Sequence, residues 1–558
     1  MSSAQALPPT VSDAANTLRQ QERERLLRQQ QERTPDINLP APARLADTQR
    51  LPDDEAQCVQ VQRIVLVGDA ADQFQWALAA ANHTGGGEPD AAVPRCLGPQ
   101  GINLVMQRMQ DAIARRGYVT TRVLASSQPA LAQDTLTLTL LPGRIGQIRF
   151  VPGTAPRATQ WNAMPVGPGD LLNLHDIEQA LENFRRIPSA EADIIFANVE
   201  GADVQPGQTD LLIRWRQGLP LRLTLSVDDG GSRSTGKLQG SATLSHDHWW
   251  TLNDLFYASF SHDLGGGDPG TRGTQGVVVH YSLPLGPWLL GLTASSNRYH
   301  QSVAGLNQTY LYAGTNDNSA VTLSRVVSRG VTHKTTLSVA GWQRTSSNFI
   351  DDTEVQVQRR RMAGWDAGVA HRQAIGTAAI EMDLNYRRGT GAGGALPAPE
   401  EAFGEGSSRA RIITAQAQLN LPFTIGAQAL RFSSAWRGQW NGTPLVPQDR
   451  FAIGGRHTVR GFNGEQQLLA ERGWTWRNDL GWQIGPHGQE LYLGIDSGQV
   501  GGPSSASLAG TRLGGAVIGL RGRYRQIYFD LFAGTPLVKP DGFKAPAQVA
   551  GFTLTASM

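Results

Sequence analysis

The chain has 558 residues, with 50 Lys and Arg against 48 Asp and Glu, a formal net charge of +2 and only 18% charged residues. It is too long for one ordinary domain, and its low charge and 13 tryptophans argue against an intrinsically disordered protein. The balanced charge gives no global reason to bind nucleic acid or another polyanion.

Residues 10–33 contain strong helix formers, but their apolar side chains form no broad face along the run ANTLRQQERERLLRQQQER. A helix that is polar almost all round does not belong to a dry core. It is therefore either a solvated helix or a helix housed in a water-filled cavity. Residues 34–57 follow as a proline-rich linker, which we expect to be extended.

The sequence has two cysteines, Cys58 and Cys96. Their spacing fits neither a zinc cluster nor a CxxC redox motif. A single disulfide that closes a long loop is the favoured interpretation, and such a bond places the protein outside the cytosol.

Residues 58–143 and 144–217 repeat one order of predicted elements: strand, helix, strand, strand. Each predicted helix, over 101–116 and 175–186, has one apolar face, made of Leu104, Val105, Met109 and Ile113 in the first and Ile177, Ala180, Leu181 and Phe184 in the second. Two consecutive segments with the same order predict a tandem pair of one small α/β fold.

From residue 218 to the end, apolar and polar residues alternate, which is typical of strands with two unlike faces. Leu221, Leu223 and Leu225 alternate with Arg222 and Thr224, and the pattern recurs at 430–440 and 474–484. A soluble sandwich would bury the apolar face. The many strands, the scarcity of charge and the lack of a predicted helix over this region favour a membrane barrel instead.

Sixteen strands can be placed in residues 218–558. Lipid does not tolerate open sheet edges, so we expect a closed antiparallel transmembrane barrel with apolar side chains outside and polar ones in the lumen. A barrel of this size encloses a water-filled channel, in which helix 10–33 could act as a plug. The longest uncharged stretch, residues 277–297, is broken by His280, Pro284, Gly286 and Pro287 and predicts no membrane helix.

The segment FAIGGRHTVRGF, residues 451–462, lies in a long loop (441–473) between the eleventh and twelfth predicted strands. Its residues Val459, Arg460, Gly461 and Phe462 resemble the VRGY/F loop motif of the Omp85 superfamily. The two preceding modules are similar to POTRA domains. With its N-terminal helix and linker, the whole chain resembles a TpsB transporter of two-partner secretion, in particular the CdiB and ShlB type.

Further segments are similar to the family: DDGG at 228–231 followed by Thr235 and Gly236, GIDSG at 494–498 and GLR at 519–521. The resemblance also implies a disulfide between Cys58 and Cys96 in the first POTRA domain. The C-terminus departs from the pattern, since outer-membrane barrels usually end on an aromatic residue and this chain ends FTLTASM. The register of the last strand is therefore left open.

In the family, the motif loop folds into the lumen and its arginine pairs with a carboxylate on the barrel wall. Here that arginine is Arg460, whose rigid fork of donors suits a carboxylate. Alternation with Leu493 and Ile495 puts Asp496 on the lumen face, and the same count points Asp530 inward. We therefore expect Asp496 as the preferred partner of Arg460, with Asp530 second.

The resemblance implies a monomeric pore in the outer membrane of a Gram-negative bacterium, in contact with outer-membrane lipid, with its POTRA domains in the periplasm. The implied client is a secreted exoprotein of the TpsA or CdiA type (a toxin, a haemolysin or an adhesin), bound unfolded by the POTRA domains, above all the second. The sequence contains no Walker pattern, so we expect the client's folding outside the cell to drive export. No enzyme activity, cofactor, metal or nucleic-acid binding is expected.

Other candidate sites are weaker. His246 and His248 share a strand face but lack further metal ligands, and the arginines at 359–361 are expected at the barrel rim. No Ser/His/Asp order or acid pair supports catalysis, which counts against a barrel hydrolase. The other alternative is a barrel-assembly factor of the same superfamily, although such proteins usually carry more modules and no plug helix.

Overall fold

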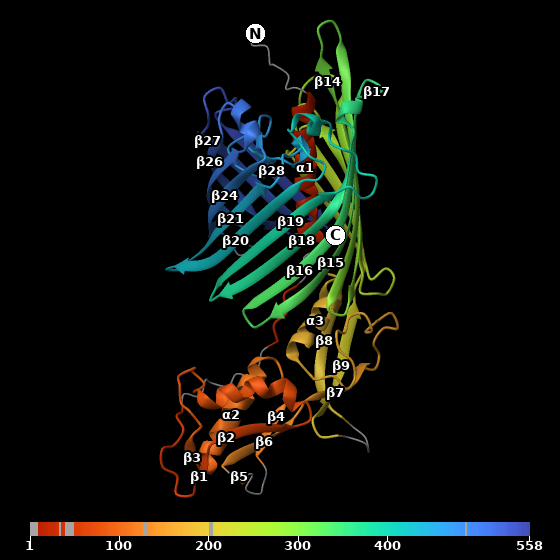
Figure 1. Ribbon diagram of the computed structural model, residues 1–558. Helices are drawn as coiled ribbons and strands as arrows, with labels where there is room; N and C mark the ends of the chain where they lie inside the picture. Colours follow the sequence, from red (N-terminus) through yellow and green to blue (C-terminus); the bar gives the residue numbers. More distant parts are fainter. Residues whose placement is uncertain are drawn as a thin grey trace.

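The computed structural model describes residues 9–32, 35–39, 49–125, 131–132, 134–199, 205–485 and 488–558. Two small α/β modules lie below a tall β-barrel, and the N-terminal helix α1 (Pro9–Gln31) runs inside the barrel (Figure 1). Of the described helices, none is both long enough and apolar enough to cross a bilayer.

The first module is a mixed sheet in the order β2-β6-β4, covered by the helices α2 and η1. Its central strand runs parallel to β2 and antiparallel to β4, and Cys58 and Cys96 form the expected disulfide beside it. The elements are β1 (Val59–Val61), β2 (Arg63–Gly68), η1 (Ala71–Asn82), β3 (Arg95–Leu97), α2 (Pro99–Arg115), β4 (Arg122–Ala125), β5 (Leu131–Ala132) and β6 (Thr135–Leu141).

The second module repeats this topology with fewer strands. Its sheet has the order β7-β9-β8. The central strand β9 runs parallel to β7 and antiparallel to β8. Its elements are β7 (Arg144–Phe150), α3 (Leu174–Arg185), β8 (Ala190–Asn198) and β9 (Gln208–Gln217). All eight helical residues predicted to face the cores of the two modules are buried, because apolar residues three and four apart share one helix face.

The barrel consists of sixteen long antiparallel strands within the described residues, which confirms the predicted class. The short strand β17 (Thr353–Glu354) extends the connection between two of them. The sixteen strands are β10 (Leu221–Asp228), β11 (Leu238–Asp247), β12 (Leu255–Gly265), β13 (Arg272–Leu285), β14 (Trp288–Ala304), β15 (Thr309–Arg329), β16 (His333–Ile350), β18 (Arg360–Ile375), β19 (Ala378–Thr390), β20 (Arg411–Ile425), β21 (Gln428–Asn441), β24 (Arg472–Gln483), β25 (Glu490–Gly501), β26 (Arg512–Tyr524), β27 (Ile527–Val538) and β28 (Val549–Ser557).

The two faces of the barrel wall differ as the alternation predicted. On β10, Leu221, Leu223 and Leu225 are exposed on the outside, whereas Thr224 is buried on the inside. The barrel closes by antiparallel pairing of β10 with β28. This pairing settles the register that the unusual C-terminus left open, since Thr224 lies opposite Ser557.

A buried ion pair ties the end of the linker to the first module. Asp90 accepts hydrogen bonds from Arg108 (2.5 Å), Arg95 (2.9 Å) and the backbone N–H of Leu51 (2.8 Å). Burial by itself would raise the pKa of Asp90, but these donors outweigh it and lower the pKa to about 2. The carboxylate therefore stabilises the module wherever it is ionised.

This linkage predicts how the first module responds to acid. The contribution of Asp90 is complete above the pKa of an unfolded aspartate, about 3.9, and is lost as the pH falls from there towards about 2. In Asp90→Asn, the urea midpoint of the module should be lower near neutral pH and should change less over this acid range. At acid pH, the stability of the module in the full chain is measured by its susceptibility to pepsin, with the exposed Asp72→Asn as control. If the stability of wild type and of Asp90→Asn changed equally with pH, the role assigned to Asp90 would be wrong.

Candidate functional site: the plugged lumen

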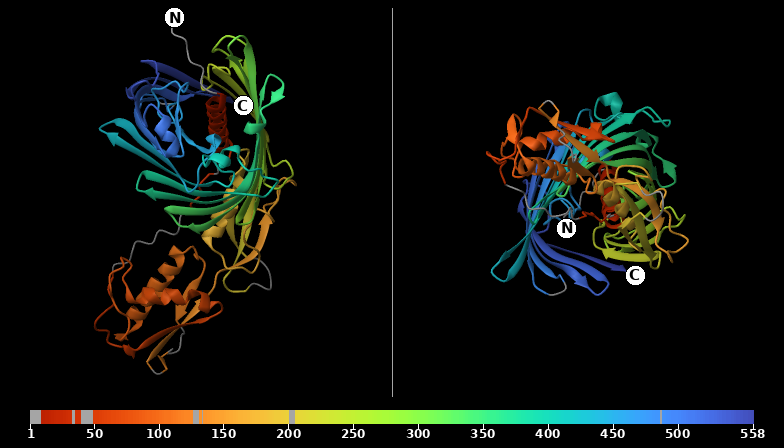
Figure 2. Two further views of the ribbon diagram at one scale, coloured as in Figure 1. Left: turned by 45° about the horizontal axis from the view of Figure 1, so that its top comes forward. Right: turned by 90° about the horizontal axis from the view of Figure 1, so that it is seen from below.

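Helix α1 lies lengthwise in the lumen of the barrel (Figures 1 and 2). Its polar surface meets polar groups of the wall. Glu22 pairs with Arg437 (3.1 Å), and Arg23 donates to Gln239 (2.9 Å). Because a wet lumen supplies partners on all sides, the helix needs no apolar face. Of the two environments that the sequence left open for this helix, the structure has the water-filled cavity.

The connection between β21 and β24, residues 442–471, folds back into the lumen and is called the inward loop. It carries η4 (Pro447–Asp449) and a small hairpin of β22 (Phe451–Ile453) and β23 (Leu468–Ala470). Its own apolar core packs on the wall and includes Ile453, Val459, Phe462, Leu468 and Ala470 with Val500, Leu513 and Phe543. The loop is thus a folded element and not a loose segment.

Arg460 of the inward loop is held against two wall carboxylates. Its Nε and Nη2 donate to the two oxygens of Asp496, both at 2.7 Å, and its backbone N–H donates to the same carboxylate at 2.9 Å. A second bond of 2.5 Å runs from Nη2 to Asp479. Arg460 and Asp496 are 3% and 1% exposed, so the pair is almost wholly withdrawn from water.

The rest of the motif brings Arg460 close to the wall. Gly461 has a φ of +98°, and a Cβ there would lie 2.5 Å from the carbonyl oxygen of Thr535, so only glycine fits without strain. Phe462 packs edge-on against Phe543 at 5.7 Å between ring centroids. Val459 is fully buried against Gly498 of β25. The four motif residues therefore act together in docking the loop.

Asp530 lies elsewhere than expected. It accepts a hydrogen bond from the Tyr492 hydroxyl (2.9 Å), and in the described part of the chain no ion pair joins it to Arg460. The second carboxylate on Arg460 is Asp479, which also pairs with Arg521 (2.9 Å). The sequence placed Asp479 on the polar face of its strand, but alternation alone does not say which lumen carboxylates lie level with the loop.

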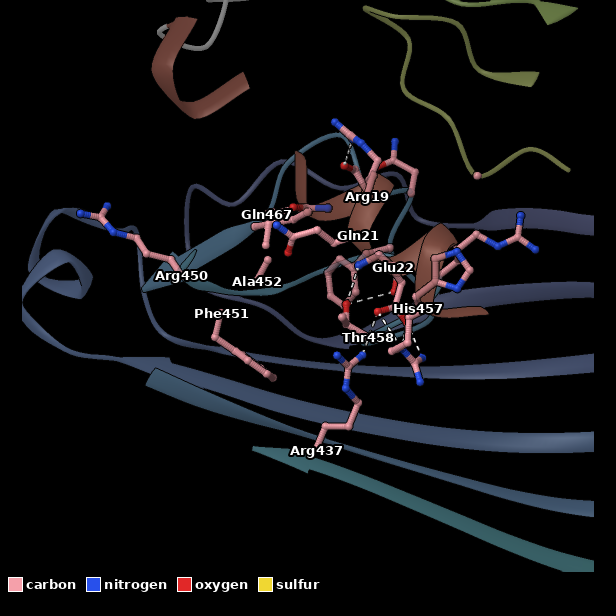
Figure 3. A pocket seen from close by; sticks show the side chains of 18 of the residues that line it. Arg19, Gln21, Glu22, Arg437, Arg450, Phe451, Ala452, His457, Thr458 and Gln467 are labelled. Carbon is pink, nitrogen blue, oxygen red and sulfur yellow. Dashed lines mark hydrogen bonds and ion pairs between the residues drawn. The ribbon is translucent and has the colours of Figure 1, made fainter. Parts of the chain in front are cut away.

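A cavity of about 600 Å³ lies between α1, the inward loop and the wall (Figure 3). The Glu22–Arg437 pair lies inside it, and cationic side chains dominate its lining. The charged residues around it are Arg19, Glu22, Arg25, Arg28, Asp229, Lys237, Arg387, Arg437, Asp449, Arg450 and Arg456. Around α1 the lumen is therefore filled by polar contacts and remaining space, whereas the inward loop packs on the wall with an apolar core.

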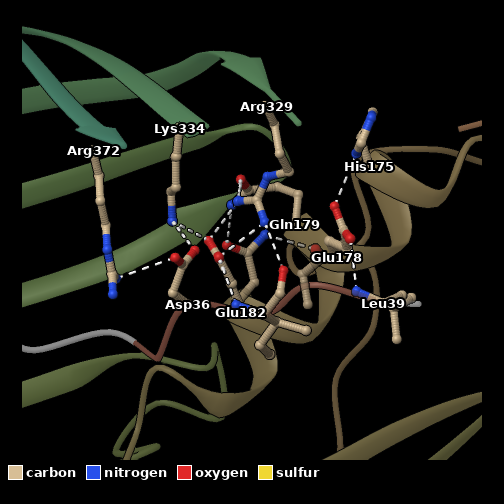
Figure 4. A network of polar contacts seen from close by, with 12 residues as sticks. Asp36, Leu39, His175, Glu178, Gln179, Glu182, Arg329, Lys334 and Arg372 are labelled. Carbon is tan, nitrogen blue, oxygen red and sulfur yellow. Dashed lines mark hydrogen bonds and ion pairs between the residues drawn. The ribbon is translucent and has the colours of Figure 1, made fainter. Parts of the chain in front are cut away.

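At the mouth of the barrel that faces the two modules, the linker that follows α1 binds the second module. The backbone N–H of Leu39 donates to Glu178 (2.7 Å), and that of Ile37 donates to Glu182 (3.3 Å) (Figure 4). Both carboxylates belong to α3 and are buried. The helix α3 of the second module therefore binds the linker directly after the plug helix.

Glu182 also binds the barrel. Arg329 and Lys334, on either side of the β15–β16 turn, each approach Glu182 to 2.7 Å, and Arg372 of β18 pairs with Asp36 of the linker at 3.1 Å (Figure 4). Burial would raise the pKa of Glu182, but Arg329 and Lys334 more than compensate and keep it below its usual range. We call five residues the mouth cluster, because together they join the linker, the second module and the barrel: Asp36, Glu182, Arg329, Lys334 and Arg372.

The weaker candidates have ordinary surroundings. His248 contacts the carbonyl oxygen of Arg157 (2.8 Å), and His246 packs beside Trp249. No group of three or more potential metal ligands occurs among the described residues. Two of the three consecutive arginines form ion pairs, Arg359 with Glu354 and Arg360 with Glu400, which fits a structural role near the rim.

A closed barrel with an apolar exterior, a lumen blocked by a helix and a folded loop, and two modules at one mouth defines the class: a transmembrane β-barrel transporter whose pore is closed in this structure. A family model described as haemolysin secretion/activation protein ShlB/FhaC/HecB matches residues 207–522. A POTRA domain model matches residues 144–197, and a ShlB-type POTRA model matches 89–143.

Individual relatives agree with the family models. The outer membrane transporter CdiB-2 of Burkholderia pseudomallei is 34% identical over 577 residues, covering 98% of this chain and 96% of that protein. CdiB of Dickeya dadantii is 27% identical over 467 residues, covering 83% and 81%. The solved structure of CdiB from Acinetobacter baumannii superposes with a TM-score of 0.86 at 26% identity and full coverage of both chains.

The chain belongs to the ShlB/FhaC/HecB family of haemolysin secretion/activation proteins, the TpsB transporters of two-partner secretion. It is an outer-membrane transporter with POTRA domains on the periplasmic side, and its family is one of transporters and not of enzymes. The expectation formed from the VRGF motif and the two modules is confirmed.

The position of α1 predicts a change in conductance when it is removed. Deleting residues 9–32 should raise the ionic conductance of the purified protein in planar bilayers, because the helix occupies the lumen. Arg437→Ala should raise it less, by loosening the contact with Glu22, and Gln29→Ala, which changes an exposed helix residue, should leave it unchanged. Equal conductance of the deletion and the wild type would contradict the plug.

Proposed function

We propose that this transporter exports one large partner exoprotein of the contact-dependent inhibition or haemolysin type from the periplasm to the cell surface. One observation above all supports it: the pore is filled by a polar helix whose linker is bound by a POTRA domain at the entrance. A pore built for small solutes has no need of such a coupling. The printed names of the relatives, CdiB and the ShlB haemolysin transporter, support the client class.

The second POTRA domain is the proposed docking site for the client. Its sheet order leaves β7 and β8 as outer strands, and Phe196 on β8 is 40% exposed. An extended client segment can add to such an edge as a further strand, with main-chain bonds for affinity and side-chain pockets for selectivity. Because α3 of this domain also carries Glu178 and Glu182, client binding acts next to the contacts that hold the plug linker.

Gating in this proposal has two parts. The plug helix must leave the lumen, which breaks its polar contacts with Arg437 and Gln239 and the linker contacts at the mouth cluster. The inward loop must give way where Arg460 is docked on the wall. Polar contacts suit a gate because water in the open lumen can replace them, whereas an apolar core would resist exposure.

A single chain is the proposed working unit. The barrel closes on itself through β10 and β28 and encloses its own pore, plug and loop. No energy source is required within the chain. Folding of the client outside the cell removes it from the pore and makes passage one-way, as expected for a long polypeptide that folds only after it emerges.

The export proposal is tested with the exoprotein encoded beside this transporter. Co-expression of the two in a Gram-negative host should deliver the exoprotein to the cell surface, and expression of the exoprotein by itself should leave it in the periplasm. Reconstituted transporter that inserts unrelated barrels into vesicles, without exporting this client, would instead support an assembly factor.

The Arg460 pair predicts a specific loss of export. Arg460→Ala removes the closest cation from the buried Asp496 and leaves Asp479 with Arg521 as its partner, and breaking a buried pair on one side costs about 3–5 kcal/mol. Surface delivery of the client should fall strongly while the barrel stays inserted and heat-modifiable on gels. Asp479→Asn should share the defect. Asp530→Asn keeps an acceptor for Tyr492 and should export normally, and normal export by Arg460→Ala would remove the pair from the mechanism.

A further inference from the structure

The seam between the first and last barrel strands is short. Thr224–Asp228 pairs with Thr553–Ser557, and at the C-terminus Leu223 and Met558 exchange backbone hydrogen bonds of 3.0 and 2.9 Å. β28 continues beyond Thr553 and stays paired with β27 as far as Val549, but β10 ends at Asp228. Phe552, the next residue of β28, therefore has no strand partner at the seam.

Unpaired backbone groups in a barrel wall are costly because lipid offers them no partner. At Phe552 two side chains supply what the missing strand does not. The Phe552 N–H donates to Asp229 Oδ1 (2.9 Å), and its carbonyl oxygen accepts from Arg456 Nη1 (3.2 Å). A side chain just after β10 and one from the inward loop thus replace the two backbone hydrogen bonds that a strand partner would make with Phe552.

The two side chains are bonded to each other and to the next residue of β28. Arg456 Nη1 lies 2.7 Å from Asp229 Oδ1, and Arg456 Nη2 donates to Thr553 Oγ1 at 2.7 Å. Arg456 and Asp229 are each 15% exposed, and the guanidinium also lies over the ring of Phe532 at 5.6 Å. One arginine of the inward loop therefore contacts β28, the end of β10 and β27.

Glycines allow this close approach. A Cβ on Gly230 would lie 3.3 Å from Arg456 Cδ, and a Cβ on Gly551 would lie 3.2 Å from Asp229 Oδ1 and 2.4 Å from the ring of Phe532. A side chain at position 551 would therefore force the Phe532 ring to move, and one at position 230 would press on Arg456. The small residues on each side of the ion pair let the loop arginine reach the backbone of the wall.

We propose that Arg456 and Asp229 form a seam staple: they complete the junction of β10 and β28 where the strand pairing ends, and they keep the barrel closed against lateral opening towards lipid. Arg456 is a positioning residue for transport, since it acts through the wall and not on the client. Nothing in this proposal depends on which client is exported.

The staple also changes how the inward loop can move. Arg460 fixes the loop to β24 and β25, and Arg456, four residues earlier, fixes it to the seam. The loop is thus bound to two separate parts of the wall. If the whole loop left the lumen, Arg456 would leave the seam with it and the seam would weaken. The barrel therefore stays closed only if the loop moves while Arg456 remains at the seam.

The test compares Arg456→Ala with Arg450→Ala, a matched change in the same loop whose arginine lies near Glu471 and not at the seam. In detergent-purified full chain, Arg456→Ala should lower the temperature at which the compact band on gels is lost by about 5 °C or more. Asp229→Asn, which keeps an acceptor for the Phe552 N–H, should give a smaller shift. Arg450→Ala loses a longer contact of 3.5 Å with Glu471, so its shift should be smaller than that of Arg456→Ala, and closing the seam should not restore it.

A disulfide across the seam tests whether Arg456 stabilises the junction of β10 and β28 or only holds the inward loop in place. Ser226 and Thr555 lie opposite each other with side-chain oxygens 3.1 Å apart, so Ser226→Cys with Thr555→Cys should bridge β10 and β28. The oxidised bridge should restore the thermal shift of Arg456→Ala, and reduction should abolish the rescue. An unchanged shift after oxidation, or an Arg456→Ala protein as heat-resistant as wild type, would overturn the proposal.

Discussion

The requirement that every backbone N–H and C=O in a bilayer find a partner within the protein governs this structure. It forces the strands of residues 218–558 to close into a barrel through the pairing of β10 with β28. Closure of sixteen strands leaves a lumen too wide to be filled by wall side chains. The polar helix, the inward loop and the charges that line the remaining cavity all follow from that space.

The lumen is held closed by a chemistry unlike that of the POTRA cores. The cores of both modules bury aliphatic and aromatic side chains away from water, which resists opening. In the lumen, α1 and Arg460 instead use ion pairs and hydrogen bonds, Glu22 with Arg437 and Arg460 with Asp496, beside the small apolar core of the inward loop. Pairs of this kind contribute little net stability, but removing one partner is costly. They can therefore fix one closed arrangement and still be replaced by contacts with water when the lumen opens.

The mouth cluster and the docking site of Arg460 are both built around a carboxylate with several partners. At the periplasmic end, Glu182 is shared by the linker, the second POTRA domain and the β15–β16 turn. Deep in the lumen, Asp479 is shared by Arg460 and Arg521. A carboxylate with several cationic or N–H partners connects elements that the chain order keeps far apart. A disturbance at the POTRA domain therefore has a direct path to the linker of the plug.

The sequence by itself determined the strand faces and the two helical cores, because periods of 2 and 3.6 are local properties of the chain. Alternation also put Asp496 on the lumen face, whereas its pairing with Arg460 and the place of the Cys58–Cys96 disulfide were expected from the resemblance to the family. The sequence did not determine that Asp479 and not Asp530 is the second carboxylate on Arg460, or that Arg456 meets the backbone of Phe552. Those contacts depend on the stagger between neighbouring strands and on the path of the inward loop. Only the closed barrel fixes these distances, because it sets which residues of separate strands stand at one level of the lumen.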